Sequence, residues 1–184
     1  MNQSLDQLVE INLIKPLTRA EVLAIITQES SGEYLFNPED LQLKFNLYHA
    51  YISTGIPVKI IQGLMTSGND IAKFRFSAAS WEWARKISDY DATDRLLLSC
   101  SYGYGQQLMR WYLLAQGIGP ANYVRAVKAF MFDPSLQVKT LVKTLLSVYN
   151  DDKALMFSKY NLNSTKVITA YGKSVLKLYE ELIK

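Results

Sequence analysis

The stretch Leu17–Gly32, LTRAEVLAIITQESSG, decides the fold class, because it carries its own signals for the start and the end of a helix. Thr18 can cap such a helix, and Glu21, three residues later, completes a capping box. Gly32 suits the C-terminal end of the helix. We therefore expect an amphipathic helix that begins at Thr18 and ends near Gly32.

Further helices are expected along most of the chain. Asn37 followed by Pro38 predicts a second helix start, and Asp133 followed by Pro134 predicts another. Helices are also expected from Pro120 and over the segment DDKALMFSKYN. The final one has an apolar stripe formed by Ile168, Tyr171, Val175, Leu178 and Leu182. The sequence thus predicts one mainly α domain over residues 1–184, with at most a small β-hairpin.

Composition excludes several classes of function. The chain has 184 residues with one cysteine and one histidine, which excludes an internal disulfide framework and a His-rich metal centre. Its net charge of +3 comes from scattered lysines, which argues against a nucleic-acid-binding protein. We expect no cofactor, and no segment has the roughly 20 apolar residues of a membrane span.

Glu29 continues an apolar helix face. Val22, Ile25, Ile26 and Glu29 follow the spacing of one face of a helix. Burial and the negative end of the helix dipole would both raise the pKa of this carboxyl group. A raised pKa suits a general acid, which must hold a proton near neutral pH. The alternative is an ordinary glutamate at a helix end, bent outward to water.

A tyrosine- and glycine-rich segment lies in the middle of the chain. It consists of Ser101, Tyr102, Gly103, Tyr104, Gly105 and Gln106. The glycines permit unusual torsion angles and close approach of a ligand. The tyrosines offer flat faces to sugar rings, and the glutamine can both donate to and accept from an N-acetyl group. The alternative is an ordinary glycine-rich turn.

Three motifs in this order resemble the lysozyme-like superfamily of goose-type lysozymes, lytic transglycosylases and phage or bacterial N-acetylmuramidases. They are Glu29-Ser30 at a helix end, SYGYGQ, and Tyr160-Asn161. The resemblance extends from about Leu17 to Leu182. It implies a lysozyme-like helical fold with Glu29 as the catalytic acid. It also implies a sugar cleft lined by Ser101, Tyr102, Gly103, Tyr104 and Gln106, and a hydroxyl group of Tyr160, next to Asn161, near that acid.

Glycoside hydrolysis usually needs a second carboxyl group. The candidates are Glu33, Glu39, Asp40, Asp89, Asp91 and Asp94. We favour Asp91 or Asp94, because their acidic loop directly precedes the glycine-rich segment. The alternative is a solvated loop in which Asp91 or Thr93 caps a helix. Without a second acid, the N-acetyl or 6-hydroxyl group of the substrate could act, as in a lytic transglycosylase.

Four other residues have a structural and a functional interpretation. Trp81 and Trp83 could form cleft walls, but at least one is expected in the core. Cys100 is expected to be a buried small hydrophobic residue rather than a nucleophile. His49 is expected to be structural.

The sequence therefore predicts a peptidoglycan muramidase that cleaves the β-1,4 bond between N-acetylmuramic acid and N-acetylglucosamine. The long segment between Glu29 and Ser101 is similar to that of phage-type muramidases, which favours a hydrolase. We expect a phage endolysin or virion lysin, made in the cytoplasm without a signal peptide. It would act on glycan strands of the cell wall after holin release or within a virion, beside other virion proteins. The alternative is a non-catalytic virion or glycan-binding protein.

Overall fold

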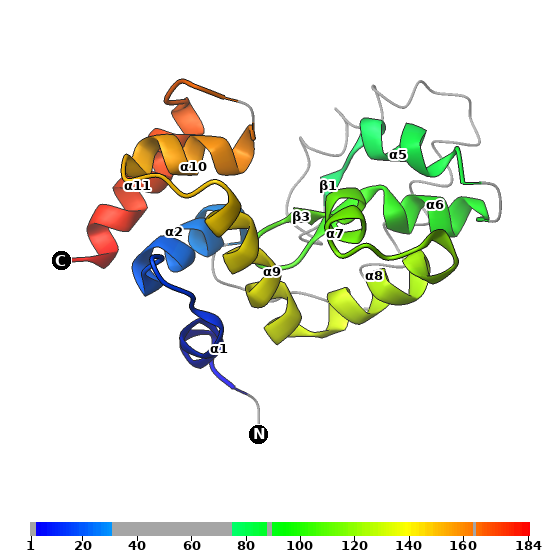
Figure 1. The fold of residues 1–184 in the computed structure, drawn as a ribbon, viewed down its shortest axis with the longest axis horizontal. Coiled ribbons are helices and arrows are strands. Elements are labelled where there is room, and N and C mark those ends of the chain that lie inside the picture. Colours follow the sequence, from blue (N-terminus) through cyan, green and yellow to red (C-terminus); the bar gives the residue numbers. More distant parts are fainter. Residues whose placement is uncertain (1–2, 31–74, 88–89, 164) are drawn as a thin grey trace. The chain divides into compact units, whose positions relative to one another are not determined.

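The computed structural model describes residues 3–30, 75–87, 90–163 and 165–184 (Figure 1). The chain divides into two compact units. The terminal unit comprises Met1–Glu33 and Pro134–Lys184, and the central unit comprises Tyr34–Asp133. Across the described residues the fold is mainly α-helical with a small antiparallel sheet, which confirms the predicted class at that level.

The described part of the terminal unit is entirely helical. Its elements are α1 (Leu5–Asn12), α2 (Arg19–Ser30), α9 (Pro134–Ser147), α10 (Lys153–Asn161) and α11 (Ala170–Leu182). Helix α11 packs against both α10 and α2, while α1 packs on α9. The core of this unit includes the fully buried side chains of Val9, Val22, Ile25, Ile26, Val138, Leu141, Val142, Leu145, Met156, Phe157 and Val175.

The predicted capping box at the start of α2 is confirmed. The backbone N–H of Thr18 donates to Oε2 of Glu21 (2.6 Å), and the N–H of Glu21 donates to Oγ1 of Thr18 (3.4 Å). A second capping box, which was not among the expected helix starts, begins α1, where Ser4 and Gln7 bond reciprocally. Its Ser-x-x-Gln pattern is visible in the sequence.

The predicted helix starts at prolines are also confirmed in part. Helix α9 begins at Pro134, and a short 3₁₀ turn η1 (Pro120–Asn122) leads into α8 (Tyr123–Phe132). The expected helix after Asn37 lies outside the described residues, as do its apolar positions and His49.

The apolar stripe predicted for the last helix is only partly buried. Val175 is buried and Tyr171 and Leu178 are half-buried, whereas Leu182 is exposed. Ile168 precedes the helix and is exposed. The stripe therefore packs mainly through its middle.

The central unit combines short helices with a three-stranded sheet. Its elements are β1 (Arg75–Phe76), α5 (Ala78–Ala84), α6 (Ala92–Leu98), β2 (Cys100–Tyr102), β3 (Gln107–Leu108), α7 (Met109–Ala115), η1 and α8. The middle strand β2 pairs antiparallel with β1, Phe76 opposite Cys100, and with β3, Tyr102 opposite Gln107. The predicted hairpin is β2–β3, and β1 adds a further strand of two residues.

Burial places Trp81 and Cys100 of the central unit in the core and leaves the role of Trp83 open. Trp81 is part of the core, as expected for at least one tryptophan, while Trp83 is half-buried beside Tyr123 with ring centroids 5.4 Å apart. Cys100 is fully buried, which confirms its predicted place in the core.

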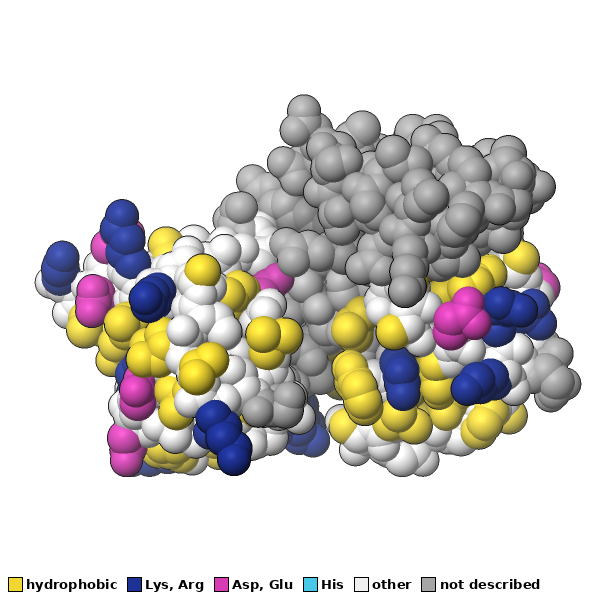
Figure 2. All heavy atoms as spheres, turned by 90° about the horizontal axis from the view of Figure 1, so that it is seen from above, with side chains coloured by type: hydrophobic (Ala, Val, Ile, Leu, Met, Phe, Trp, Pro, Cys, Tyr) yellow, Lys and Arg dark blue, Asp and Glu magenta, His cyan; other side chains and the backbone are white. Residues whose placement is uncertain are grey.

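The surface charges agree with the scattered pattern of the sequence. On the face seen in Figure 2, basic and acidic side chains are interspersed with apolar ones. In the part of the chain that the structure describes, no helix is both long enough and apolar enough to cross a membrane.

Candidate functional site

Glu29 lies in the last turn of α2 and is held by a tyrosine from the far end of the chain. The hydroxyl of Tyr171 in α11 donates to Oε1 of Glu29 at 2.6 Å. Val22, Ile25 and Ile26 on the same helix face are fully buried, whereas Glu29 is half-buried. The carboxyl group is therefore at the boundary between core and solvent, in a defined orientation. The predicted rise in its pKa stays a prediction.

A second contact from α11 to α2 lies beside the first. The hydroxyl of Ser174 donates to Oε1 of Gln28 at 2.8 Å. Tyr171 and Ser174 are three residues apart and so lie on one face of α11. The end of α2 is thus attached to α11 through two adjacent side chains.

The tyrosine that contacts Glu29 differs from the one predicted. The resemblance assigned this role to Tyr160, with Asn161 beside it. Both lie in the last turn of α10, where Tyr160 is half-buried and Asn161 exposed. The hydroxyl of Tyr171, which was expected only as part of an apolar stripe, bonds to Glu29, and the role of Tyr160 stays a prediction.

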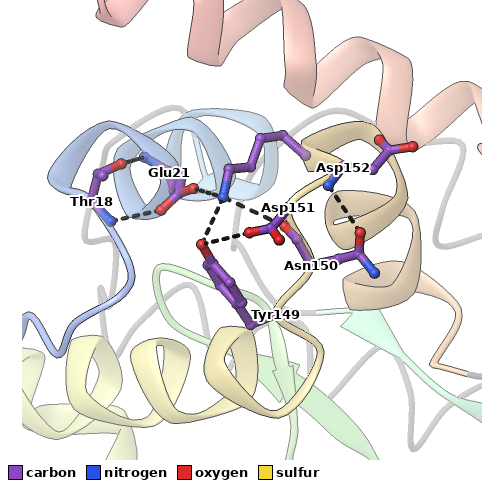
Figure 3. A network of polar contacts seen from close by, with 7 residues as sticks. Thr18, Glu21, Tyr149, Asn150, Asp151 and Asp152 are labelled. Carbon is purple, nitrogen blue, oxygen red and sulfur yellow. Dashed lines mark hydrogen bonds and ion pairs between the residues drawn. The ribbon is translucent and has the colours of Figure 1, made fainter.

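A buried ion pair supports the other end of α2, and no pattern in the sequence predicted it. Nζ of Lys153 lies 2.8 Å from Oε1 of Glu21, whose side chain is 1% exposed. Lys153 also donates to the hydroxyl of Tyr149 (3.2 Å), and its Nζ lies 4.4 Å from the centre of that ring. Figure 3 shows this network, in which Thr18 lies beside Glu21, and Glu21 and the hydroxyl of Tyr149 both contact the lysine ammonium group.

The charge balance of this network favours the protonated lysine. Burial acts to lower the pKa of Lys153, but the hydrogen bonds and charge of Glu21 and Tyr149 outweigh it, and the pKa is raised above its ordinary value. The lysine is therefore protonated at neutral pH, and its ion pair with Glu21 holds α2 to the start of α10.

Of the two favoured second carboxylates, Asp91 has a clear structural role. Its Oδ1 accepts from the backbone N–H of Asp94 at 2.8 Å, which makes it the N-cap of α6. This confirms the alternative interpretation of Asp91 as a cap. A catalytic role for Asp91 or Asp94 stays a prediction.

Asp94 differs from Asp91 in its surroundings. It is half-buried, and burial raises its pKa, with a further increase from the nearby charge of Asp91 and an opposing effect of Lys128. A carboxyl group with this shift takes up a proton at a higher pH than an exposed aspartate. If Asp94 were the base of the reaction, activity would begin to fall at that higher pH on acidification.

Substitutions at Asp91 separate its cap from the predicted catalytic role. Asp91→Asn keeps a side-chain cap, so we expect stability to change by only a few tenths of a kcal/mol, while Asp91→Ala should cost about 1 kcal/mol. A loss of activity in Asp91→Asn at unchanged thermal stability would identify a catalytic carboxylate. Equal activity of Asp91→Asn and wild type would leave it as a cap alone. Thermal denaturation and release of soluble muropeptides measure the two effects.

The tyrosine–glycine segment forms the turn between β2 and β3. Gly103 has φ +79° and Gln106 has φ +46°, so two positions of this turn are left-handed. Gln106 closes it, because Nε2 of its amide donates to the carbonyl of Gly103 (3.1 Å) and Oε1 accepts from the hydroxyl of Ser101 (3.2 Å). The interpretation as a glycine-rich turn is thus confirmed.

The tyrosines of this segment require a correction. Tyr102 is 0% exposed, and its hydroxyl donates to the carbonyl of Leu97 at 3.1 Å. Tyr104 is buried too, and burial raises its pKa. Stacking on a sugar needs an exposed ring face, so this burial disagrees with the predicted stacking roles. The sequence shows aromatic residues here, but it does not show that both faces of β2 are buried.

The predicted site residues fall in both units. Glu29, Tyr160 and Asn161 belong to the terminal unit, and the others belong to the central unit: Asp91, Asp94, Ser101, Tyr102, Gly103, Tyr104 and Gln106. The further candidates Glu33, Glu39, Asp40 and Asp89 lie outside the described residues. Among the residues that are described, no group of three or more His, Cys, Asp or Glu side chains could hold a metal ion.

No family model, no curated protein and no solved structure matches this chain.

Proposed function

We propose that this protein is a peptidoglycan muramidase of the lysozyme type, with Glu29 as the general acid. The observation that carries the proposal is the carboxyl group of Glu29 at the end of α2, half-buried and held by the hydroxyl of Tyr171 at 2.6 Å. A carboxyl group fixed at the edge of a core is suited to donate a proton to one atom of a bound substrate. The motifs Glu-Ser, SYGYGQ and Tyr-Asn occur in the order that resembles the lysozyme-like superfamily. This resemblance is the reason for proposing peptidoglycan as the substrate.

In the proposed reaction Glu29 donates its proton to the glycosidic oxygen as the bond to C1 of N-acetylmuramic acid breaks. The oxygen of a water molecule then bonds to C1. A general base, which glycosidases usually supply as a second carboxylate, accepts a proton from this water. The products are a free hydroxyl on N-acetylglucosamine and a new reducing end.

A lytic transglycosylase is the second candidate. The cap formed by Asp91 favours it, because a carboxylate that already accepts the N–H of Asp94 is less suited to activate water. In this reaction Glu29 first donates its proton to the glycosidic oxygen as the bond from that oxygen to C1 breaks. The 6-hydroxyl of the same sugar then bonds to C1 and gives its proton to the carboxylate of Glu29. The product is then a 1,6-anhydro sugar.

We also propose that the enzyme acts on the bacterial cell wall. Its substrate is the glycan strand of the bacterial wall, reached after holin release or from within a virion. A non-catalytic glycan-binding protein would instead retain peptidoglycan without cutting it.

The test is a digestion of purified peptidoglycan. Wild-type protein should release soluble muropeptides and clear a suspension, as a known lysozyme does in parallel. Binding to sedimented peptidoglycan without release of muropeptides would favour the non-catalytic alternative and contradict the proposal.

A further inference from the structure

We infer that Ser158, Thr169 and Gly172 are positioning residues that fix the first turn of α11, and through Tyr171 the orientation of Glu29. As a statement about catalysis, this inference rests on the proposed function. As a statement about the Glu29 carboxyl group, it stands independently.

The first observation is the close approach of α10 and α11, which Figure 1 shows packed together. A Cβ atom added at Gly172 would lie 2.0 Å from Oγ of Ser158 and 2.5 Å from the carbonyl oxygen of Ala154. Glycine is unfavourable inside a helix, so its place here has a packing reason. The backbone of α11 lies directly against α10 at this point.

The second observation is the set of hydrogen bonds at the same point. Ser158 is fully buried, and its hydroxyl donates to the carbonyl of Ala154 at 2.7 Å. Its Oγ also accepts from the N–H of Thr169 (2.9 Å) and from the hydroxyl of Thr169 (3.2 Å). Thr169 in turn caps α11, since its Oγ1 accepts from the N–H of Gly172 at 3.1 Å. One buried hydroxyl thus holds the cap of the next helix.

Because α11 is a regular helix, fixing its first turn against α10 also fixes the direction of Tyr171. Neighbouring residues in a helix point about 100° apart. With Gly172 against α10, Tyr171 and Ser174 lie on the face that contacts α2, through Glu29 (2.6 Å) and Gln28 (2.8 Å). A rotation or shift of the first turn of α11 would therefore lengthen the bond to Glu29.

Two substitutions test the inference, each with a matched control. Ser158→Ala and Thr169→Val remove the hydroxyl groups, Thr169→Ser keeps one, and Ser147→Ala removes an exposed hydroxyl that bonds within α9. We expect Ser158→Ala and Thr169→Val to lower kcat roughly tenfold with KM within about twofold, because the acid is misplaced and not the binding surface. Thr169→Ser and Ser147→Ala should behave as wild type.

A second readout does not depend on activity. In protein labelled with ¹³C at its glutamate carboxyl groups, the Glu29 signal is identified by its absence in Glu29→Gln. Ser158→Ala and Thr169→Val should move this signal in the same sense as Tyr171→Phe does, and the two controls should not. Thr169 is only half-buried, so Thr169→Val decides the question if Ser158→Ala fails to fold.

The outcomes separate the two proposals. A lower melting temperature with wild-type kcat and an unmoved Glu29 signal would overturn the inference and leave these residues merely structural. If wild type releases no muropeptides while the signal moves as expected, the proposed function fails and the positioning role stands.

Discussion

Glu29→Gln is expected to lower the rate of muropeptide release by roughly 10²–10⁴-fold, the contribution of a general acid. The amide has nearly the shape of the carboxyl group and can still accept the hydrogen bond from Tyr171, so the fold should be preserved. Binding to insoluble peptidoglycan should persist. Release of soluble sugar, binding by sedimentation and thermal denaturation measure the three effects.

The control for this substitution is Glu10→Gln. Glu10 is an exposed glutamate of α1 in the same unit, so its substitution removes one negative charge without touching α2. It should retain full activity. Equal activity of Glu29→Gln and Glu10→Gln would show that Glu29 takes no part in the reaction.

Lys153→Met is expected to destabilise the protein by about 3 kcal/mol, because it leaves the buried carboxylate of Glu21 without its cation. The pKa of Lys153 is raised, so its contribution is fully present below the ordinary lysine pKa of about 10.4 and is lost as the pH rises through the higher folded value. The difference between wild type and Lys153→Met should therefore be constant around neutral pH and shrink only in strong alkali. Urea denaturation at several pH values measures it.

The control is the double variant Glu21→Gln, Lys153→Met. A glutamine at this position keeps the capping box with Thr18, since either residue can form it. It needs no cation, so the double variant should be more stable than Lys153→Met alone. The stability of the single variant Glu21→Gln is measured as well. If the double variant loses as much stability as the two single variants together, the ion pair contributes nothing to stability.

Local features of the fold could be predicted from the sequence. The capping box of Thr18 and Glu21 and the helix start at Pro134 depend on residues within one turn of each other, so the pattern is readable. The unusual torsion angles expected at the glycines are also a local property, and Gly103 does have a positive φ.

The contacts that orient the candidate site could not be predicted in this way. Glu29 and Tyr171 are 142 residues apart, and no local sequence pattern around either residue indicates that they are in contact. Glu21 and Lys153 likewise come together only when α2 and α10 pack in one core. A stripe of apolar positions placed Tyr171 on a buried face of α11 but gave no reason to expect its hydroxyl at a carboxylate.

Residue type was also a poor guide to exposure. Tyr102 follows the pattern of a sugar-stacking aromatic, but it is fully buried, and its neighbours in β2 are buried too. Asp91 has the charge of a catalytic base and the position of a helix cap, and the sequence left both interpretations open.

Digestion of peptidoglycan in H₂¹⁸O, followed by mass spectrometry, tests most directly whether this chain cleaves glycan strands through Glu29. The account predicts muropeptides with one ¹⁸O at the new reducing end from wild type and almost none from Glu29→Gln. Unlabelled anhydro products would identify a transglycosylase in place of the hydrolase. Intact glycan strands after incubation with well-folded wild-type protein would contradict the account.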